Sequence, residues 1–290
     1  MGYADYINLA INGLVEGLII ALPALALTLV YGLARFPNAA TGDIVAVGGY
    51  AGLAVHQVTG SLVAAGLAGA AGGALASVLA FVLAFRPVIR RSVITLLLTS
   101  IGVGFVIRAV LGVAFGHDPR AFDMPLDRAW RFGDISLAPA DLNLAGLTLA
   151  TLLLVFIMLY ATPLGRSLRA IADDPDLARV SGIRRERCMF AMWSIAGMVC
   201  GIAGTVVGMR TVVYPDAGWN MLLPAFAAAV VGGLGNPVGA VLGALLLGVL
   251  QELSTPFVGF VYKIALGYVF MMIVLLLRPQ GLFNRPQGVR

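Results

Sequence analysis

The sequence predicts an all-α fold: a polytopic transmembrane helical bundle of about eight to ten spans, with broken or re-entrant helices and a cytoplasmic coupling helix. Of the 290 residues, 60% are hydrophobic and only 11% are charged, whereas a soluble domain carries about 25% charged residues. Apolar runs long enough to cross a bilayer core of about 30 Å recur along the chain. These runs are continuous rather than alternating in polarity, which is typical of membrane-spanning helices.

The chain is expected to fold as one transmembrane domain over residues 1–290. Each predicted helix is an apolar run that ends at charged, glycine or proline residues. The number of crossings stays between about eight and ten, because the 33–59 region and the run at 220–234 could be re-entrant. The predicted helices occupy residues 7–33, 44–59, 62–85, 93–115, 143–162, 188–208, 220–234, 238–255 and 259–277.

The charges of the connections predict the orientation. The connection around Arg86–Arg91, the segment 162–187 and the C-terminal tail are rich in arginine, so the positive-inside rule places them in the cytoplasm. The connection 116–142 holds five aspartates and three arginines and is predicted to be external. Nine crossings with an external N-terminus satisfy these assignments. The net charge of +5 arises largely from arginines at span ends and does not indicate nucleic acid binding.

The segment 162–187 is a polar island between two apolar runs, with six arginines and four acidic residues. Its middle, residues 167–181, is predicted to form a short amphipathic helix that ends near Gly182, where a glycine relieves backbone strain. A cytoplasmic amphipathic helix between two spans indicates a docking element for another protein. Polar contacts at this dock are expected from Arg169, Asp173, Asp174 and Arg179, and apolar contacts from Ile171 and Ile183. For each charge, a solvated surface position is the alternative.

Helix breakers interrupt the apolar sequence at two places, residues 35–43 and residues 230–240. Non-helical backbone at membrane depth is tolerated only inside protein or along a wet cavity, so these breaks are candidates for a solute pathway. The alternative is that both are ordinary loops at the cytoplasmic surface. The candidate pathway residues in the breaks are Asn38, Thr41, Gly42, Asp43, Gly232, Gly233, Gly235 and Asn236.

Acidic residues inside the apolar sequence have two competing interpretations. Asp43 is expected to cap a helix that starts at Ile44, because its carboxylate can accept the unpaired N–H groups there, and this role is compatible with a position on the pathway. Glu16 lies within the first run, where an ionisable residue indicates either a pathway or a partner on a neighbouring helix. For Arg108, a snorkelling position is the alternative to a functional one.

Several functional classes are excluded by what the sequence lacks. It contains no nucleotide-binding P-loop, no catalytic triad and no histidine–cysteine metal cluster. The chain is therefore expected to be a non-catalytic membrane subunit without a metal or cofactor of its own. If ATP powers transport, another polypeptide must bind and hydrolyse it.

Four stretches together resemble a known family. They are LALTLVYGLARFPNAATGD (25–43), GRSLRAIADDPDLARVSGI (165–183), LLPAFAAAVVGGLGNPVGAVLGALLLGVLQEL (222–253) and RPQGLF (278–283). The chain is similar to the branched-chain amino-acid permeases of the LivH type. The spacing of Ala178 and Gly182 also resembles the coupling segment of ATP-binding-cassette (ABC) importer permeases.

The resemblance implies a multi-pass subunit of an importer in the bacterial inner membrane. Its partners would be a second, LivM-like permease, two cytoplasmic ATPases and a periplasmic solute-binding protein. The solutes would be branched-chain or other hydrophobic amino acids, with urea, short amides or other small solutes as alternatives. The family commonly has Asn-Phe-Ala-His-Gly-Asp where this chain has residues 38–43, NAATGD. An ion-coupled secondary transporter or channel that uses Glu16 or Asp43 is the alternative from another class.

Overall fold

The computed structural model describes residues 3–123, 130–132, 135–259 and 262–284, and it confirms an all-α membrane protein. Every one of the nine predicted runs contains a helix. The corresponding helices are α1 (Tyr3–Ala34), α2 (Ala40–Thr59), α3 (Leu62–Ala80), α5 (Val93–Phe115), α6 (Pro139–Ala161), α9 (Arg185–Arg210), α10 (Ala217–Gly232), α11 (Pro237–Val258) and α12 (Lys263–Leu277). Within the described residues, six helical segments are long and apolar enough to cross a membrane.

Shorter elements complete the fold. A π-helical turn, Phe81–Phe85, joins α3 to the short helix α4 (Arg86–Val88). Two helices, α7 (Pro163–Asp173) and α8 (Pro175–Val180), form the polar island. The strands β1 (Trp130–Phe132) and β2 (Ile135–Leu137) pair antiparallel, with Trp130 opposite Leu137.

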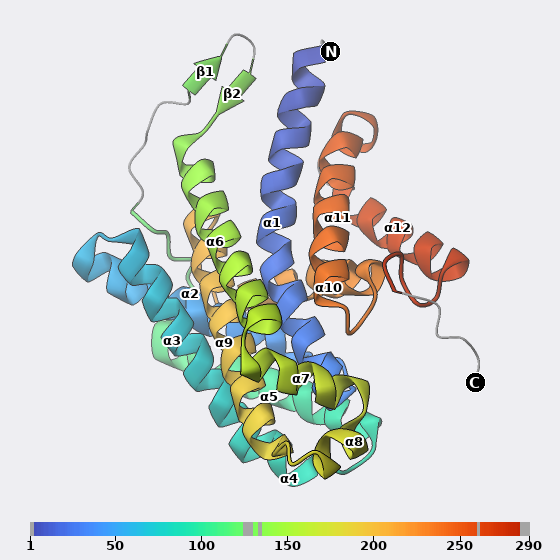
Figure 1. Ribbon diagram of the computed structural model, residues 1–290. Coiled ribbons are helices and arrows are strands. Elements are labelled where there is room, and N and C mark those ends of the chain that lie inside the picture. The colour runs from blue at the N-terminus through green and yellow to red at the C-terminus, as the bar shows by residue number, and fades with distance from the viewer. Residues whose placement is uncertain (1–2, 124–129, 133–134, 260–261, 285–290) are drawn as a thin grey trace.

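The two kinds of connection lie at opposite ends of the bundle. Figure 1 shows the β1–β2 hairpin and the start of α1 at one end, and α4, α7 and α8 at the other. This separation agrees with the predicted split between the connection 116–142 and the segment 162–187. We call these the hairpin end and the α7 end. That the α7 end faces the cytoplasm remains a prediction from the charge distribution.

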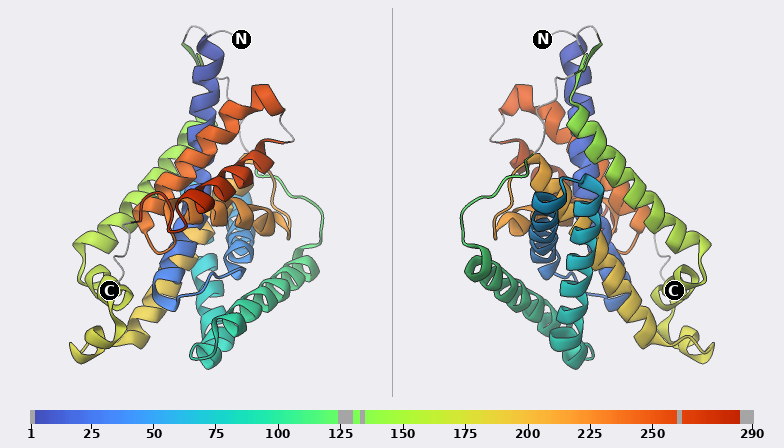
Figure 2. Two further views of the ribbon diagram at one scale, coloured as in Figure 1. Left: turned by 90° about the vertical axis from the view of Figure 1, so that its right-hand side faces the viewer. Right: turned by 90° about the vertical axis from the view of Figure 1, so that its left-hand side faces the viewer.

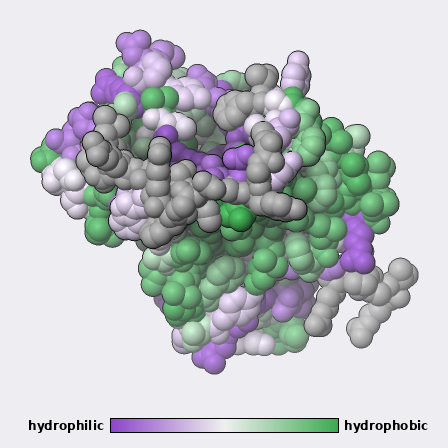
Figure 3. Space-filling view, turned by 90° about the horizontal axis from the view of Figure 1, so that it is seen from above, coloured by the Kyte–Doolittle hydropathy of each residue, from purple (hydrophilic) through white to green (hydrophobic). Residues whose placement is uncertain are grey.

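Helix α1 lies at the centre of the bundle, and other helices incline around it. The most apolar window of α1 is 83% buried, whereas that of α5 is only 17% buried. Figure 2 shows α5 and α6 inclined on opposite flanks. Seen from the hairpin end, hydrophilic residues gather on one part of that end and hydrophobic residues cover the broad flank beside them (Figure 3).

Glycine allows α9 to pack closely between α2 and α3. A Cβ on Gly201 would collide with the backbone of Gly69 in α3, and one on Gly48 in α2 would collide with the backbone of Gly201. Lipid removes the hydrophobic drive between membrane helices, so close backbone approach at small residues supplies much of their packing. This packing fixes α2, and with it the first break, relative to α9.

The run at 220–234 forms a short helix. Helix α10 has only 16 residues and is not among the six segments long enough to cross a membrane. Its start packs at Gly218 against Gly42 of α2, and the turn that follows it lies beside Arg169 of α7. Whether this run is re-entrant stays a prediction.

The polar island forms two helices instead of the single helix predicted over residues 167–181. The break falls at Asp174, whose backbone is extended, with φ −146° and ψ 102°. Pro175 explains it, because a proline disfavours helical geometry at the preceding residue. The Asp174 carboxylate then accepts the N–H groups of Asp176 and Leu177, both at 3.0 Å, and caps α8.

Candidate functional site

The first break positions the start of α2 inside the bundle. Asn38 is buried, and its side-chain oxygen accepts the N–H of Ala40 at 3.1 Å. The N–H of Ala39 donates to the hydroxyl of Ser100 in α5 at 3.1 Å. The helix thus begins at Ala40, and the prediction that Asp43 caps a helix starting at Ile44 is wrong. The carboxylate has a different partner.

Asp43 belongs to an ion cluster that joins three segments. Arg108 of α5 donates to one carboxylate oxygen of Asp43 through Nη2 at 3.0 Å and Nε at 3.2 Å. The same Nε lies 3.3 Å from a carboxylate oxygen of Asp216, just before α10. The two carboxylates differ in burial: the Asp43 side chain is 2% exposed, and the Asp216 side chain is 53% exposed. Arg108 therefore pairs with a buried carboxylate and also reaches an accessible one.

Aromatic side chains flank this cluster. The Arg108 guanidinium lies 5.1 Å from the ring centroid of Trp219 in α10 and 5.3 Å from that of Phe105 in α5. Both distances are within the range of cation–π interactions. Arg108 lies about 10 Å before the end of α5 at a rise of about 1.5 Å per residue, and its guanidinium is held there by partners before and within α10 as well as by Asp43 of α2.

Close backbone contact brings α2 and α10 together at this level. A Cβ on Gly42 would collide with the backbone of Gly218, and a Cβ on Gly104 would collide with the Asp43 carboxylate. Thr41 is also buried here. The first break therefore places Thr41, Gly42 and Asp43 at a meeting point of α2, α5 and α10.

Glu16 lies apart from the cluster. Its carboxylate pairs with Arg210 of α9 at 2.8 Å, and Arg210 also lies 3.8 Å from Asp141 of α6. The network joins α1, α6 and α9 near the hairpin end. Glu16 therefore has the partner on a neighbouring helix that one of its two interpretations required.

The second break lies towards the α7 end and does not join the Asp43 cluster. Gly233 and Gly235 have positive φ values of 106° and 89°, which favour glycine. Asn236 caps α11 by accepting the N–H of Gly239 at 3.1 Å, and its amide donates to the carbonyl of Phe283 at 3.0 Å. Gly232 packs against Gly239. These residues form a tight turn between α10 and α11.

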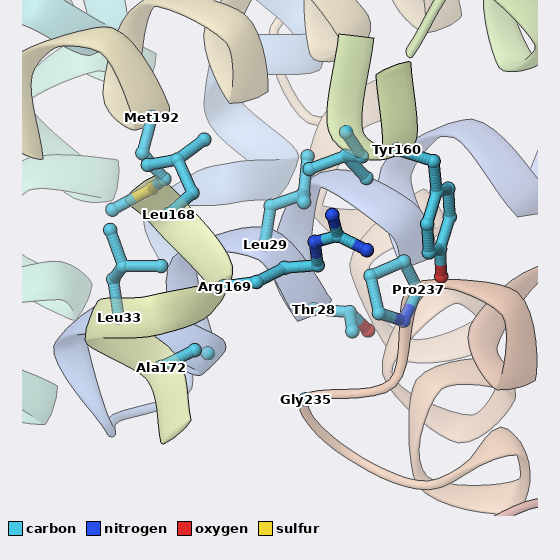
Figure 4. Close-up of a pocket in the computed structure, with 12 residues that line it drawn as sticks. Thr28, Leu29, Leu33, Tyr160, Leu168, Arg169, Ala172, Met192, Gly235 and Pro237 are labelled. Atoms are coloured by element: carbon cyan, nitrogen blue, oxygen red, sulfur yellow. The ribbon is translucent and has the colours of Figure 1, made fainter. Parts of the chain in front are cut away.

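A small pocket of about 80 Å³ separates α7 from this turn. Figure 4 shows Arg169 of α7 reaching across the pocket towards Tyr160 and Pro237, with Thr28 and Gly235 below it. The Arg169 guanidinium lies 4.9 Å from the ring centroid of Tyr160. Helix α7 thus lies beside the second break.

Helix α7 also contacts the first break. Arg35 begins that break, and its guanidinium donates to the carbonyl of Ala172 in the last turn of α7. Arg35 is the one non-glycine residue with positive φ among the described residues, at 59°. Sequence reasoning missed this contact, because nothing in the local pattern pairs Arg35 with a residue 137 positions away.

The predicted coupling residues divide into buried and exposed sets. Ile171 and Ala178 are buried and Ile183 is half-buried. Arg169, Asp173, Asp174 and Arg179 are exposed at the α7 end.

Gly182 ends α8 in the left-handed conformation, with φ 82°, as the sequence predicts. Its N–H donates to the carbonyl of Arg179, and the N–H of Ile183 donates to that of Ala178, both at 3.1 Å. This pair of bonds is a Schellman motif, and both Ala178 and Ile183 pack with the hydrophobic core.

The α7 end carries an exposed surface that the sequence did not single out. Leu177 and Val180 of α8 are 64% and 86% exposed, although both are apolar. Beside them, a groove of about 760 Å³ between α4, α8 and α9 is lined by arginines and acids. Its charged lining residues are Arg86, Arg90, Asp176, Arg179, Arg185 and Glu186.

Comparisons with known proteins agree with this architecture. The profile of the family described as branched-chain amino acid transport system / permease component matches residues 9–278. The high-affinity branched-chain amino acid transport system permease protein LivH of Escherichia coli (strain K12) is 28% identical, over 95% of this chain and 94% of that protein. The corresponding protein LivM is also 28% identical, over 69% of this chain and 54% of its own length. The structure of PsaBC from Streptococcus pneumoniae in complex with Fab has a similar fold, with a TM-score of 0.51 at 15% identity, over 93% of this chain and 91% of that one.

Proposed function

Because this chain belongs to the family of branched-chain amino acid transport permease components, we propose that it is the membrane subunit of an ABC importer for branched-chain or other hydrophobic amino acids. The observation that carries the proposal is the family match over residues 9–278. The importer would lie in a bacterial inner membrane, with the α7 end in the cytoplasm. A LivM-like second permease and a periplasmic solute-binding protein would complete the membrane and external parts.

Two cytoplasmic ATPase subunits would supply the energy. The sequence has no P-loop of its own. The α7 end has exposed apolar and charged side chains that an ATPase subunit, called the motor below, could contact. Exposed Leu177 and Val180 can enter an apolar groove on a partner. The arginines and acids around them can make polar contacts that fix the orientation.

The contacts of α7 suggest how a motor could reach the pathway. ATP binds the closed motor better than the open one, and this difference drives the change of state. Movement of α8 would pass to α7, which contacts Arg35 at the first break and lies beside Gly235 at the second. Through the first break, the movement would reach Asp43 and the ion cluster.

The ion-coupled alternative is less well supported. A carboxylate that loads and releases a coupling ion has to exchange partners easily. Asp43 and Glu16 each pair with an arginine, Arg108 and Arg210 respectively. Such pairing favours a structural or gating role for both acids.

The proposed function is tested by co-expressing this chain with the other proposed subunits of the transporter and purifying the complex through a tag on this chain. We expect two ATPase subunits and a second permease to copurify. Reconstituted vesicles should then import an amino acid with ATP, and a proton gradient alone should not drive uptake. Uptake driven by a proton gradient without ATPase subunits would reject the proposal in favour of the secondary transporter.

Replacing Arg35 by glycine is expected to lower ATP-driven uptake several-fold without destabilising the protein. A non-glycine residue at a left-handed φ costs about 1–2 kcal/mol, which glycine avoids. The substitution also removes the donor to the carbonyl of Ala172. Uptake and ATP hydrolysis are measured in vesicles, and thermal unfolding is measured in detergent.

Two further variants separate the backbone from the side chain. Arg35→Ala keeps the strained backbone and loses the guanidinium, so it should lose uptake and also some stability. Arg35→Lys keeps the charge and should keep part of the uptake. Wild-type uptake in Arg35→Gly would show that this contact transmits no movement.

A further inference from the structure

Tyr50 marks a polar position that the pathway described so far does not use. It lies on α2, its ring stacks on Phe115 with centroids 4.6 Å apart, and it is 3% exposed. Its hydroxyl has no hydrogen-bond partner among the described residues. A buried hydroxyl without a partner costs about 1–3 kcal/mol, so such a group in a native protein calls for an explanation such as a ligand or an ordered water.

Two oppositely charged residues, Arg120 and Asp216, lie on segments that adjoin this part of α2, because a Cβ on Gly49, next to Tyr50, would contact the side chain of Val213. Both charged side chains are exposed. Arg120 follows α5, and its guanidinium donates to the carbonyl of Phe115 at 2.8 Å. Asp216 precedes α10 and is shared with Arg108. A cation and an anion thus lie on neighbouring segments of the bundle.

The backbone holds these two charges in place. Arg120 and Val213 exchange both main-chain hydrogen bonds, at 2.9 and 2.8 Å. Val213 is buried and lies three positions before Asp216. These bonds join the segment after α5 to the segment before α10, and they keep Arg120 close to the segment that carries Asp216.

Trp219 adds an aromatic face beside the anion. Its ring already lies over the Arg108 guanidinium and is 38% exposed. A ring next to a carboxylate attracts ammonium groups. The environment of Asp216 is thus suited to a positively charged nitrogen, and that of Arg120 and Tyr50 to a carboxylate, which accepts hydrogen bonds from guanidinium and hydroxyl groups.

We propose that Asp216, Trp219, Tyr50 and Arg120 form a binding site for the zwitterionic head of an α-amino acid on the hairpin side of the ion cluster. Asp216 and Trp219 receive the ammonium group, and Arg120 and the Tyr50 hydroxyl receive the carboxylate. This inference rests on the proposed function and deepens it. It assigns the solute to amino acids and excludes neutral solutes such as urea and short amides, which could use neither charge.

The test measures binding of radiolabelled L-leucine to the purified complex of this chain and its partner subunits, without the solute-binding protein. Three competitors keep the side chain of leucine and change its head: isopentylamine, isocaproate and isocaproamide. We expect leucine to bind best, the amine and the carboxylate to compete weakly, and the neutral amide to compete least.

Matched variants assign the charges. Asp216→Asn should weaken the binding of leucine and isopentylamine several-fold and leave the binding of isocaproate unchanged. Arg120→Gln should weaken the binding of leucine and isocaproate and leave the binding of isopentylamine unchanged. Tyr50→Phe should follow Arg120→Gln with a smaller effect. A merely structural role would instead weaken all the compounds equally, and that result would overturn the site.

The remaining outcomes separate this inference from the proposed function. ATP-driven uptake together with equal binding of leucine and isocaproamide, or with no leucine binding, overturns the site and leaves the importer intact. ATP-driven uptake of urea alone also overturns it. Absence of any ATP-driven amino acid uptake by the complete transporter counts against the importer of amino acids itself.

Discussion

Replacing Arg108 by leucine is expected to destabilise the bundle by about 3–5 kcal/mol, because it would leave the buried Asp43 carboxylate without its partner. The Asp43 side chain is 2% exposed, and within the described part of the chain both side-chain donors to its carboxylate belong to Arg108. Desolvating an ion is tolerable only when its partner is present. Thermal unfolding of the purified complex and the yield of folded protein measure the loss.

Two controls show whether the lost ion pair is the cause. The double variant Arg108→Leu with Asp43→Asn removes both charges and should recover most of the stability. Arg86→Leu breaks the ion pair with Glu186, whose side chains are 53% and 60% exposed, and an exposed pair is worth about 1 kcal/mol or less. Equal losses in the single and double Arg108 variants would contradict the buried-charge argument.

The helices of this fold could be predicted from the sequence because each is encoded locally. Nine apolar runs gave nine helices, since burying such a run in lipid requires that its own backbone satisfy its hydrogen bonds. The boundaries failed where a local signal was misread. The side chain of Asn38 accepts a hydrogen bond at the start of α2, so the helix begins at Ala40 and not at the predicted Ile44. Pro175 divided the predicted helix at 167–181 in the same way.

The partners of the charged residues could not be predicted, because they depend on how distant segments pack. Asp43 and Arg108 are 65 positions apart, and Glu16 and Arg210 are 194 positions apart. Sequence reasoning identified Glu16, Asp43 and Arg108 as unusual for an apolar environment, which was the available signal. It had no means to add Asp216, because an aspartate between Pro215 and Ala217 in a connection is unremarkable without the tertiary fold.

The position of α7 changes the interpretation of the two breaks. The sequence grouped both breaks in one candidate pathway. In the structure only the first reaches the ion cluster, and Gly232–Asn236 form the turn between α10 and α11 near α7. Both breaks nevertheless lie against α7, through Arg35 and Gly235. The second break therefore belongs, in our proposal, to the coupling path rather than to the solute path.

Replacing Gly182 by valine is expected to abolish coupled uptake while ATP hydrolysis by the complex continues. Gly182 has φ 82°, a conformation that costs a non-glycine residue about 1–2 kcal/mol and that a β-branched residue rarely adopts. No atom lies within 4 Å of a Cβ placed there, so the substitution acts through the backbone and not through a collision. The Schellman bonds that join Gly182 and Ile183 to α8 would be lost, and Leu177 and Val180 would no longer face the motor in a fixed orientation.

A graded series tests this cause. Asparagine tolerates the left-handed conformation better than other non-glycine residues, so Gly182→Asn should keep more uptake per ATP hydrolysed than Gly182→Ala, and Gly182→Val should keep least. The ratio of uptake to hydrolysis in vesicles is the measurement, and copurification of the ATPase subunits checks that the dock still assembles. Wild-type coupling in Gly182→Val would refute the role of this cap. A uniform loss across the three variants would place the effect in the side chain instead of the backbone. The order asparagine, alanine, valine follows only if the end of α8 must hold a left-handed residue for the motor to move the permease.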